Sequence, residues 1–235
     1  MAELLTEKKN IGSLFNRIAG HYDTLNHLLS AGIDRRWRRK AVKGMPAGGE
    51  WLDVAVGTAD LTLEILRQDK ARRITAVDLS EGMMQIGREK VAKAGLADRV
   101  DFLPADCQHL PFAERRFHSI TCAFGVRNFQ HLDEGLREMY RVMEPGGELM
   151  ILELSYPGNR LVRTVYDFYF TRILPWIGGL LSHDKKAYRY LNNSVKHFLW
   201  GRALCDRIAA AGFTGVAFTP LTLGICTVYR ARKEG

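Results

Sequence analysis

Three residues have the types and spacing of a nucleoside-binding site. Asp53 ends an apolar run, Gly57 follows it within Trp51-Leu-Asp-Val-Ala-Val-Gly-Thr-Ala-Asp60, and Asp78 lies 21 residues beyond the glycine. A glycine lets the backbone approach a ligand closely. A carboxylate roughly 20 residues later accepts ribose hydroxyls in dinucleotide-type folds. We therefore predict a ligand with a nucleoside part at this turn.

The charge of the turn separates two such ligands. NAD is bound by a G-x-G-x-x-G turn whose helix N-terminal amides face a pyrophosphate, whereas this chain has Ala55-Val-Gly-Thr-Ala-Asp60. Asp53 and Asp60 would repel a pyrophosphate but suit a sulfonium with an amino-acid tail. A further acidic residue, Asp106, follows the third expected strand. S-adenosylmethionine is therefore favoured, and NAD is the weaker alternative.

The order of elements places these residues at one edge of a sheet. Apolar periodicity predicts strands over 51–54, 73–77, 100–104, 117–122 and 148–154, and helices over 60–67, 80–93 and 133–143. Such alternation implies a parallel sheet with helices on both faces and right-handed crossovers. Ligands of such sheets bind outside the carboxyl ends of the strands.

The alternation of strands and helices is interrupted after Ser155, where an apolar and aromatic segment is inserted. A helix over 202–211 and two strands over 215–219 and 225–230 follow it, and their short link predicts an antiparallel hairpin. We expect one domain over 1–235. Its parts are an N-terminal helical cap (1–46), a cofactor-binding core (50–155), a helical lid insert (157–195), and a final helix and hairpin (200–232).

Composition excludes several classes of protein. The start of the chain lacks the apolar stretch of a signal peptide, and no run reaches the length of a membrane span. The cysteines, Cys107, Cys122, Cys205 and Cys226, form no C-x-x-C pair, which argues against a metal site or a disulfide framework. We expect a cytoplasmic protein, with peripheral attachment at the inner membrane left open.

The net charge is +8, and its densest basic cluster is Asp34-Arg-Arg-Trp-Arg-Arg-Lys40. On a helix with Trp37 facing inward, these arginines form a solvated face or contact an anionic membrane. No nucleic-acid motif accompanies them, so we expect no nucleic-acid partner. A homodimer is left open.

Four segments carry a resemblance to a known family: Tyr22-Asp-Thr-Leu-Asn26, Phe124-Gly-Val-Arg-Asn-Phe129, Met139 to Gly147, and Pro220 to Tyr229. From about residue 15 to 229 the chain resembles the ubiquinone/menaquinone biosynthesis C-methyltransferases. The resemblance implies a class I (Rossmann-like) α/β methyltransferase fold with a seven-stranded, mostly parallel sheet whose last strand is antiparallel. It also implies S-adenosyl-L-methionine as methyl donor, no metal, and a polyprenylated naphthoquinol as acceptor, so that demethylmenaquinol becomes menaquinol.

The resemblance assigns donor contacts to Thr58, Asp78 and the pair Asp106-Cys107, which join Asp53 and Gly57 from the turn. One position departs from the family pattern, because Ala59 stands where glycine is usual. A positive φ at this alanine would cost on the order of 1 kcal/mol, whereas a helical φ would cost nothing.

Methylation of a ring carbon needs a neighbouring hydroxyl to lose its proton, so the site requires a donor or cation for the phenolate. Arg127 is the first candidate for this catalytic role, and the alternative is a structural pair with Asp53 or Asp106. Tyr22 is the second candidate, either in the acceptor site or in the core. The aromatic insert over 165–181 is either core or an apolar tunnel for an isoprenoid chain.

Two alternative functions remain from the sequence. One is C-methylation of a polyprenyl benzoquinol in ubiquinone biosynthesis. The other is a non-catalytic subunit that binds S-adenosylmethionine without turnover, which the departure at Ala59 would allow.

Overall fold

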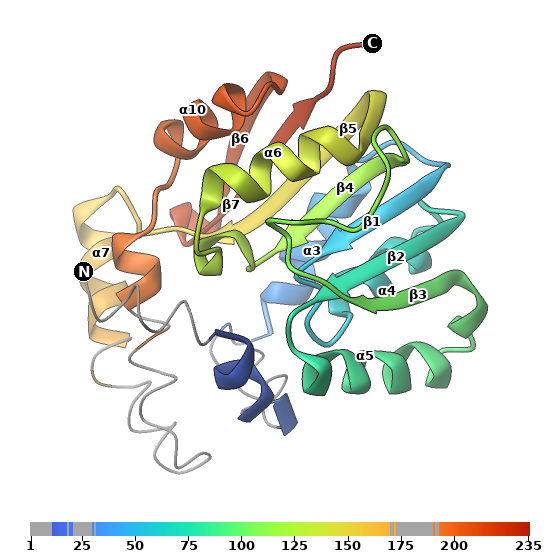
Figure 1. The fold of residues 1–235 in the computed structure, drawn as a ribbon. Helices are drawn as coiled ribbons and strands as arrows, with labels where there is room; N and C mark the ends of the chain where they lie inside the picture. Colours follow the sequence, from blue (N-terminus) through green and yellow to red (C-terminus); the bar gives the residue numbers. More distant parts are fainter. Residues whose placement is uncertain are drawn as a thin grey trace.

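Seven strands form the central sheet, in the order β3-β2-β1-β4-β5-β7-β6 (Figure 1). The computed structural model describes residues 11–17, 19–20, 30, 32–169, 172, 190 and 193–235. The strands are β1 (Glu50–Val54), β2 (Arg73–Asp78), β3 (Val100–Pro104), β4 (Phe117–Ala123), β5 (Met143–Leu154), β6 (Thr214–Leu221) and β7 (Cys226–Arg232).

The helices connect these strands in the expected alternation. They are α3 (Asp34–Lys43), α4 (Asp60–Arg67), α5 (Glu81–Lys93), α6 (Leu132–Val142), α7 (Arg160–Phe168) and α10 (Arg202–Ala210), with short 3-10 turns η1 (Ala97–Arg99), η2 (Val126–Asn128) and η4 (Thr222–Gly224). Residues 11–17 and 19–20 are also helical. Ser80 caps α5 as predicted, because its hydroxyl accepts a hydrogen bond from the Met83 amide.

The pairing of the strands confirms the predicted mixed sheet. β1 pairs in parallel with both β2 and β4, and β5 pairs in parallel with β4. β7 runs antiparallel to its neighbours β5 and β6. β2 follows β1 on one side of it, and β4 is added later on its other side. Ligands of such sheets bind at the point where the strand order reverses.

Side chains alternate between two buried cores, one on each face of the sheet. In β5, Met150 and Leu152 join the core under α3, α4 and α5. Leu149 and Ile151 join the core under α6 and α10. Figure 1 shows α6 and α10 on one face and α3 and α4 on the other. The two helical layers hold the sheet rigid, so that its carboxyl edge can support a site.

One boundary differs markedly from the prediction. β5 begins at Met143, and the expected turn at 145–147 lies inside it. Phe117 pairs with Met143 but Ser119 pairs with Glu148, so the ladder is irregular at this point. Gly146 takes a positive φ of 80° within the irregularity. The Pro-Gly-Gly sequence therefore makes a bulge-like excursion in one strand rather than ending the helix with a separate turn.

Among the described residues, no helix combines the length and apolarity that crossing a membrane would need.

Candidate active site

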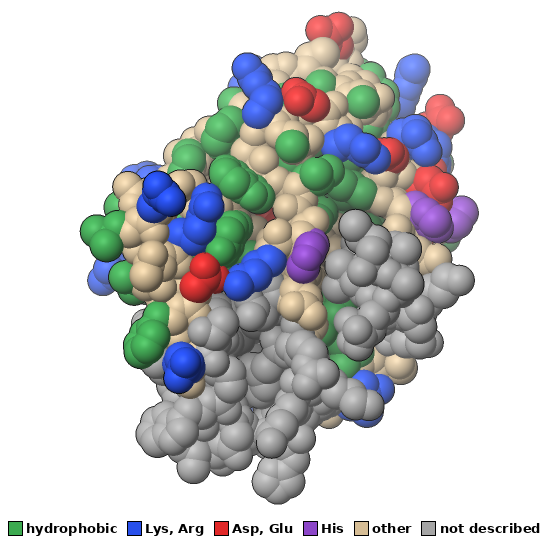
Figure 2. Space-filling view, turned by 90° about the vertical axis from the view of Figure 1, so that its left-hand side faces the viewer, with side chains coloured by type: hydrophobic (Ala, Val, Ile, Leu, Met, Phe, Trp, Pro, Cys, Tyr) green, Lys and Arg blue, Asp and Glu red, His purple; other side chains and the backbone are tan. Residues whose placement is uncertain are grey.

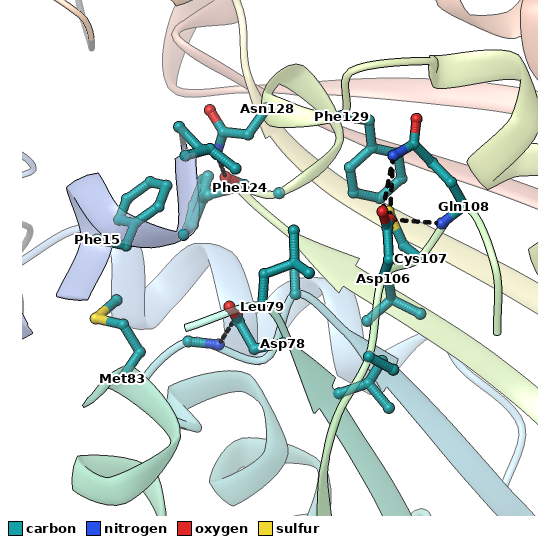
Figure 3. A pocket seen from close by; sticks show the side chains of 18 of the residues that line it. Phe15, Asp78, Leu79, Met83, Asp106, Cys107, Gln108, Phe124, Asn128 and Phe129 are labelled. Carbon is teal, nitrogen blue, oxygen red and sulfur yellow. Dashed lines mark hydrogen bonds between the residues drawn. The ribbon is translucent and has the colours of Figure 1, made fainter. Parts of the chain in front are cut away.

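A cavity of about 290 Å³ opens at the carboxyl edge of the sheet. Residues that follow β1, β2, β3 and β4 line it, together with the helix over 11–17. Figure 3 shows Phe15 and Met83 on one side, Asp106 and Phe129 on the opposite side, and Asp78 between them. The structure thus brings Gly57, Asp78, Asp106 and Cys107 together, as the sequence predicted.

Asp78 organises the loop that follows β1. One carboxylate oxygen accepts a hydrogen bond from the Gly57 amide at 2.8 Å, and the other accepts from the Ser80 amide at 2.8 Å. Burial raises the pKa of Asp78, and these backbone donors oppose the rise. A carboxylate oxygen has more than one acceptor position. Asp78 can therefore hold the loop and still accept hydroxyl groups of a ligand in the cavity.

The loop after β1 takes left-handed backbone conformations at alternate residues. Ala55, Gly57 and Ala59 have φ values of 54°, 55° and 64°. A Cβ added at Gly57 would lie 3.6 Å from Met83 Cε, so glycine is favoured here by conformation more than by space. The positive φ at Ala59 selects the strained alternative for that residue, with a cost on the order of 1 kcal/mol.

Asp53 lies behind this loop and is 1% exposed. Its carboxylate accepts hydrogen bonds from the Thr62 hydroxyl at 2.6 Å and the Thr121 hydroxyl at 2.7 Å. Burial raises its pKa to about 6, while the two hydroxyls and Arg38 act in the opposite direction. Asp53 lines a second, smaller cavity of about 30 Å³, which shares Ala55, Gly57 and Phe124 with the main one. Direct contact between Asp53 and the donor stays a prediction.

The smaller cavity also contains Thr58, Asp60 and Arg38. Lys90 donates to the Thr58 hydroxyl at 3.3 Å and forms an ion pair with Asp60. The Arg38 guanidinium pairs with Asp34 and lies 3.3 Å from Asp60, and its Cζ lies 5.5 Å from the centre of the Phe124 ring. Arg38 therefore places a positive charge among carboxylates beside the turn.

Asp106 and Cys107 follow β3 at the far side of the main cavity (Figure 3). The Asp106 carboxylate accepts from the backbone and side-chain amides of Gln108 at 2.9 and 3.1 Å. Gln108 in turn accepts from the His131 amide at 2.7 Å. Burial raises the pKa of the Cys107 thiol, so it is neutral. A donor contact through Asp106 and Cys107 stays a prediction.

Arg127 lies in η2 and is buried against Glu153 of β5. Its Nη1 lies 2.7 Å from Glu153 Oε1, its backbone amide donates to Glu153 Oε2 at 3.2 Å, and Nη1 also donates to the Phe124 carbonyl. The sequence predicted Asp53 or Asp106 as the structural partner of Arg127, and this prediction is wrong. The carboxylate that pairs with Arg127 is that of Glu153, on β5. A catalytic role for Arg127 stays a prediction. Its neighbours Phe124 and Asn128 line the main cavity.

The second catalytic candidate, Tyr22, lies outside the described residues, as do Phe170, Ile173 and Leu174 of the aromatic insert. The longer helical lid insert (157–195) does contact the site through a residue beyond this aromatic segment. Tyr190 donates to Asn128 Oδ1 at 2.9 Å.

The sequence reasoning missed two residues, Arg38 and Glu153. Arg38 was assigned to a solvated basic face, but it is 6% exposed, while Arg35, Arg36 and Arg39 are exposed. Its position next to the buried Trp37 was the available signal. Glu153 stands alone in the apolar run of β5, and a charge in a buried strand predicts a paired partner.

No cluster of three or more metal-ligating side chains occurs in the part of the chain that the structure describes.

Comparisons with known proteins agree with this geometry. Residues 3–233 match the ubiE/COQ5 methyltransferase family. The chain is 44% identical to the demethylmenaquinone methyltransferase of Bacteroides fragilis over 97% of this chain and 94% of the relative. It is 47% identical to the ubiquinone/menaquinone biosynthesis C-methyltransferase UbiE of Geobacter sulfurreducens over 97% and 91%.

Among solved structures, a SAM-dependent methyltransferase from Thermotoga maritima superposes with a TM-score of 0.66 at 18% identity, covering 95% of this chain and 99% of that chain. This similarity supports the class I fold. From the family match, the identities over nearly the full length and the cavity at the carboxyl edge, the chain belongs to the ubiE/COQ5 methyltransferase family and is an S-adenosylmethionine-dependent methyltransferase.

Proposed function

We propose that this enzyme methylates a ring carbon of demethylmenaquinol, a polyprenylated naphthoquinol, and so forms menaquinol. The observation that carries the proposal is a cavity at the carboxyl edge of the sheet whose lining combines the carboxylates of Asp78 and Asp106 with aromatic residues. The relative from Bacteroides fragilis, named a demethylmenaquinone methyltransferase, supports the choice of acceptor.

The donor side of the cavity fits S-adenosylmethionine. Asp78 would accept hydrogen bonds from ribose hydroxyls, and Leu79 and Met83 offer apolar contact to a purine. Arg38 would bind the carboxylate of the amino-acid tail, because it is a buried cation beside the turn. When bound, the donor supplies an electrophilic methyl group on sulfur.

We place the acceptor beside Phe124, Asn128 and Phe129, which line the cavity. Their task is to hold the ring carbon close to the methyl group, and such positioning can supply roughly 7 to 11 kcal/mol of the barrier. Arg127 would stabilise the phenolate that forms when the neighbouring hydroxyl loses its proton. Glu153 would keep its guanidinium in place. Tyr22 remains our candidate for a further acceptor contact.

The acceptor carries an isoprenoid chain, so we also propose that the enzyme works in peripheral contact with an anionic membrane.

Thr58, Asp106 and Cys107 would complete the contacts to the methyl donor.

The proposal is tested by incubating the enzyme with reduced demethylmenaquinone or with the corresponding benzoquinol, together with isotope-labelled donor. Mass spectrometry then locates the label. We expect label on the naphthoquinol ring and none with Asp78→Ala, which should lose donor affinity. Methylation of the benzoquinol alone would overturn the assignment.

That benzoquinol reaction is a second candidate, because the relative from Geobacter sulfurreducens is named for both quinone routes. A non-catalytic subunit would bind the donor and label neither acceptor.

Arg127 is tested by separating donor binding from turnover. In Arg127→Ala we expect donor affinity to hold while kcat falls by about 100-fold or more, since loss of one stabilising donor has that effect at other oxyanion sites. Arg127→Lys should recover part of the activity. A variant that keeps its turnover would show that Arg127 is structural.

A further inference from the structure

One side of α7 presents apolar side chains to the outside. Leu161, Val165 and Phe168 recur at helical spacing and are 75%, 63% and 60% exposed. The buried side carries Tyr166, which forms a small core with Val195. A surface helix of a globular domain usually has the opposite arrangement, with its apolar stripe facing the core. The exposed stripe is therefore a candidate contact surface.

Two loops lie beside the start of α7 and add exposed apolar residues. Trp200 lies beside the start of α7, because a Cβ on Gly158 would be 3.9 Å from its Cη2 atom. A Cβ on Gly224 would lie 3.9 Å from Pro157 Cα, which places η4 at the same end of the helix. We define the α7 face by its five exposed apolar residues: Leu161, Val165, Phe168, Trp200 and Leu223.

Basic residues outnumber acidic ones in the segments that carry the α7 face. Residues 157–172 and 193–202 contain five Lys or Arg and one acidic residue, Asp167. The Asp167 carboxylate is already engaged, with Lys196 at 2.8 Å and the Tyr156 hydroxyl at 2.6 Å. Arg160, Arg172 and Arg202 are exposed. Figure 2 shows hydrophobic side chains interspersed with Lys and Arg on this side of the molecule.

We propose that the α7 face docks the enzyme on an anionic phospholipid surface. A second copy of the chain would bring like charges together around this face, whereas anionic headgroups would pair with the arginines while the apolar residues enter the boundary of the acyl chains. Trp200 suits this depth, since an indole ring prefers the membrane interface. The proposal rests on the proposed function in one respect, namely that the acceptor is carried in a bilayer.

The same helix connects the docking surface with the acceptor side of the site. Burial raises the pKa of Tyr166, and the nearby Arg127 opposes that rise. Leu154, next to Glu153, packs in the same small core as Tyr166. Docking through one side of α7 would therefore place its other side, with Arg127, close to the membrane that supplies the quinol.

The test is sedimentation with vesicles that contain about one third phosphatidylglycerol, compared with vesicles of phosphatidylcholine alone. The double variant Arg160→Ser/Arg202→Ser is matched by Arg35→Ser/Arg36→Ser, which removes the same charge from exposed positions of α3. Each basic residue near an anionic surface contributes roughly five-fold to binding, so the first pair should weaken it about 25-fold. The α3 pair should weaken it less than five-fold, and Leu161→Glu/Phe168→Glu should abolish it.

Activity on a short-chain, water-soluble quinol without vesicles serves as the folding control, and all three variants should keep it. If the α3 and α7 double variants lose vesicle binding equally, net charge rather than the α7 face drives binding, and the proposal is overturned. Wild-type vesicle binding by Leu161→Glu/Phe168→Glu, with a change from dimer to monomer in analytical ultracentrifugation, would instead make the face an interface between copies. If the native enzyme methylates no quinol while the vesicle results hold, the proposed function fails and the docking surface stands.

Discussion

The buried carboxylate of Asp53 should make the stability of the enzyme depend on pH. Burial raises its pKa from 3.8 to about 6 in the folded protein. Because the folded-state pKa is the higher one, folding favours the protonated form. The stability from this group is fully present below pH 3.8 and is lost as the pH rises through about 6. At about 1.4 kcal/mol for each tenfold change in acidity, the loss is about 3 kcal/mol at most.

We expect Asp53→Asn to remove this dependence. The amide oxygen can accept from one of the two threonine hydroxyls that bind Asp53, and the amide nitrogen can donate to the other. The free energy of unfolding of the variant should exceed that of the native protein by about 1 to 3 kcal/mol near pH 8, and the difference should approach zero near pH 4.

The assay is urea unfolding without donor at both pH values, followed by circular dichroism. Asp98→Asn, at an exposed position of η1, is the matched control and should show no such difference. A variant that is less stable than the native protein near pH 8, or that differs equally at both pH values, would refute the reasoning. A parallel titration with donor would show whether Asp53 also contributes to donor affinity.

Three further substitutions test other contacts. Glu153→Gln should lower the free energy of unfolding in urea by about 3 to 5 kcal/mol, because it leaves the Arg127 charge buried without its carboxylate; a loss below about 1 kcal/mol would argue against a strong pair. Arg38→Met should weaken donor binding in calorimetry by at least about ten-fold, the value of a charged hydrogen bond, and unchanged affinity would remove Arg38 from the donor site. Ala59→Gly should raise thermal stability by on the order of 1 kcal/mol, because it relieves a φ of 64°; a lower melting temperature would contradict this.

Much of the fold was predictable because local patterns and tertiary structure agree. The helix over 60–67 and the strand over 100–104 have the predicted bounds, since an apolar periodicity marked each of them. Prediction failed at the start of β5. Pro145-Gly-Gly147 has the composition of a turn, but Met143 just before it pairs with Phe117 of β4, which lies far earlier in the chain, and no local pattern records that pairing.

The candidate site, like the fold, could be predicted from the sequence only in part. Asp78 and Asp106 were predictable because parallel strands bring their carboxyl ends to one edge of the sheet. The partner of Arg127 was not, because Glu153 lies 26 residues further along the chain and only the register of β4 and β5 brings the two together. Arg38 was missed for a related reason, since five charged neighbours suggested a solvated face and only packing against α4 turns it inward.

The place of β7 in the sheet has a consequence for synthesis on the ribosome. β7 lies between β5 and β6, yet it follows both of them along the chain. β5 ends at Leu154 and β7 begins at Cys226, so at typical elongation rates roughly 4 to 14 seconds separate them. During that interval the apolar β5 has an open edge that can pair with other nascent chains. Slow codons placed within this interval should therefore lower the yield of folded enzyme more than the same codons placed ahead of β5.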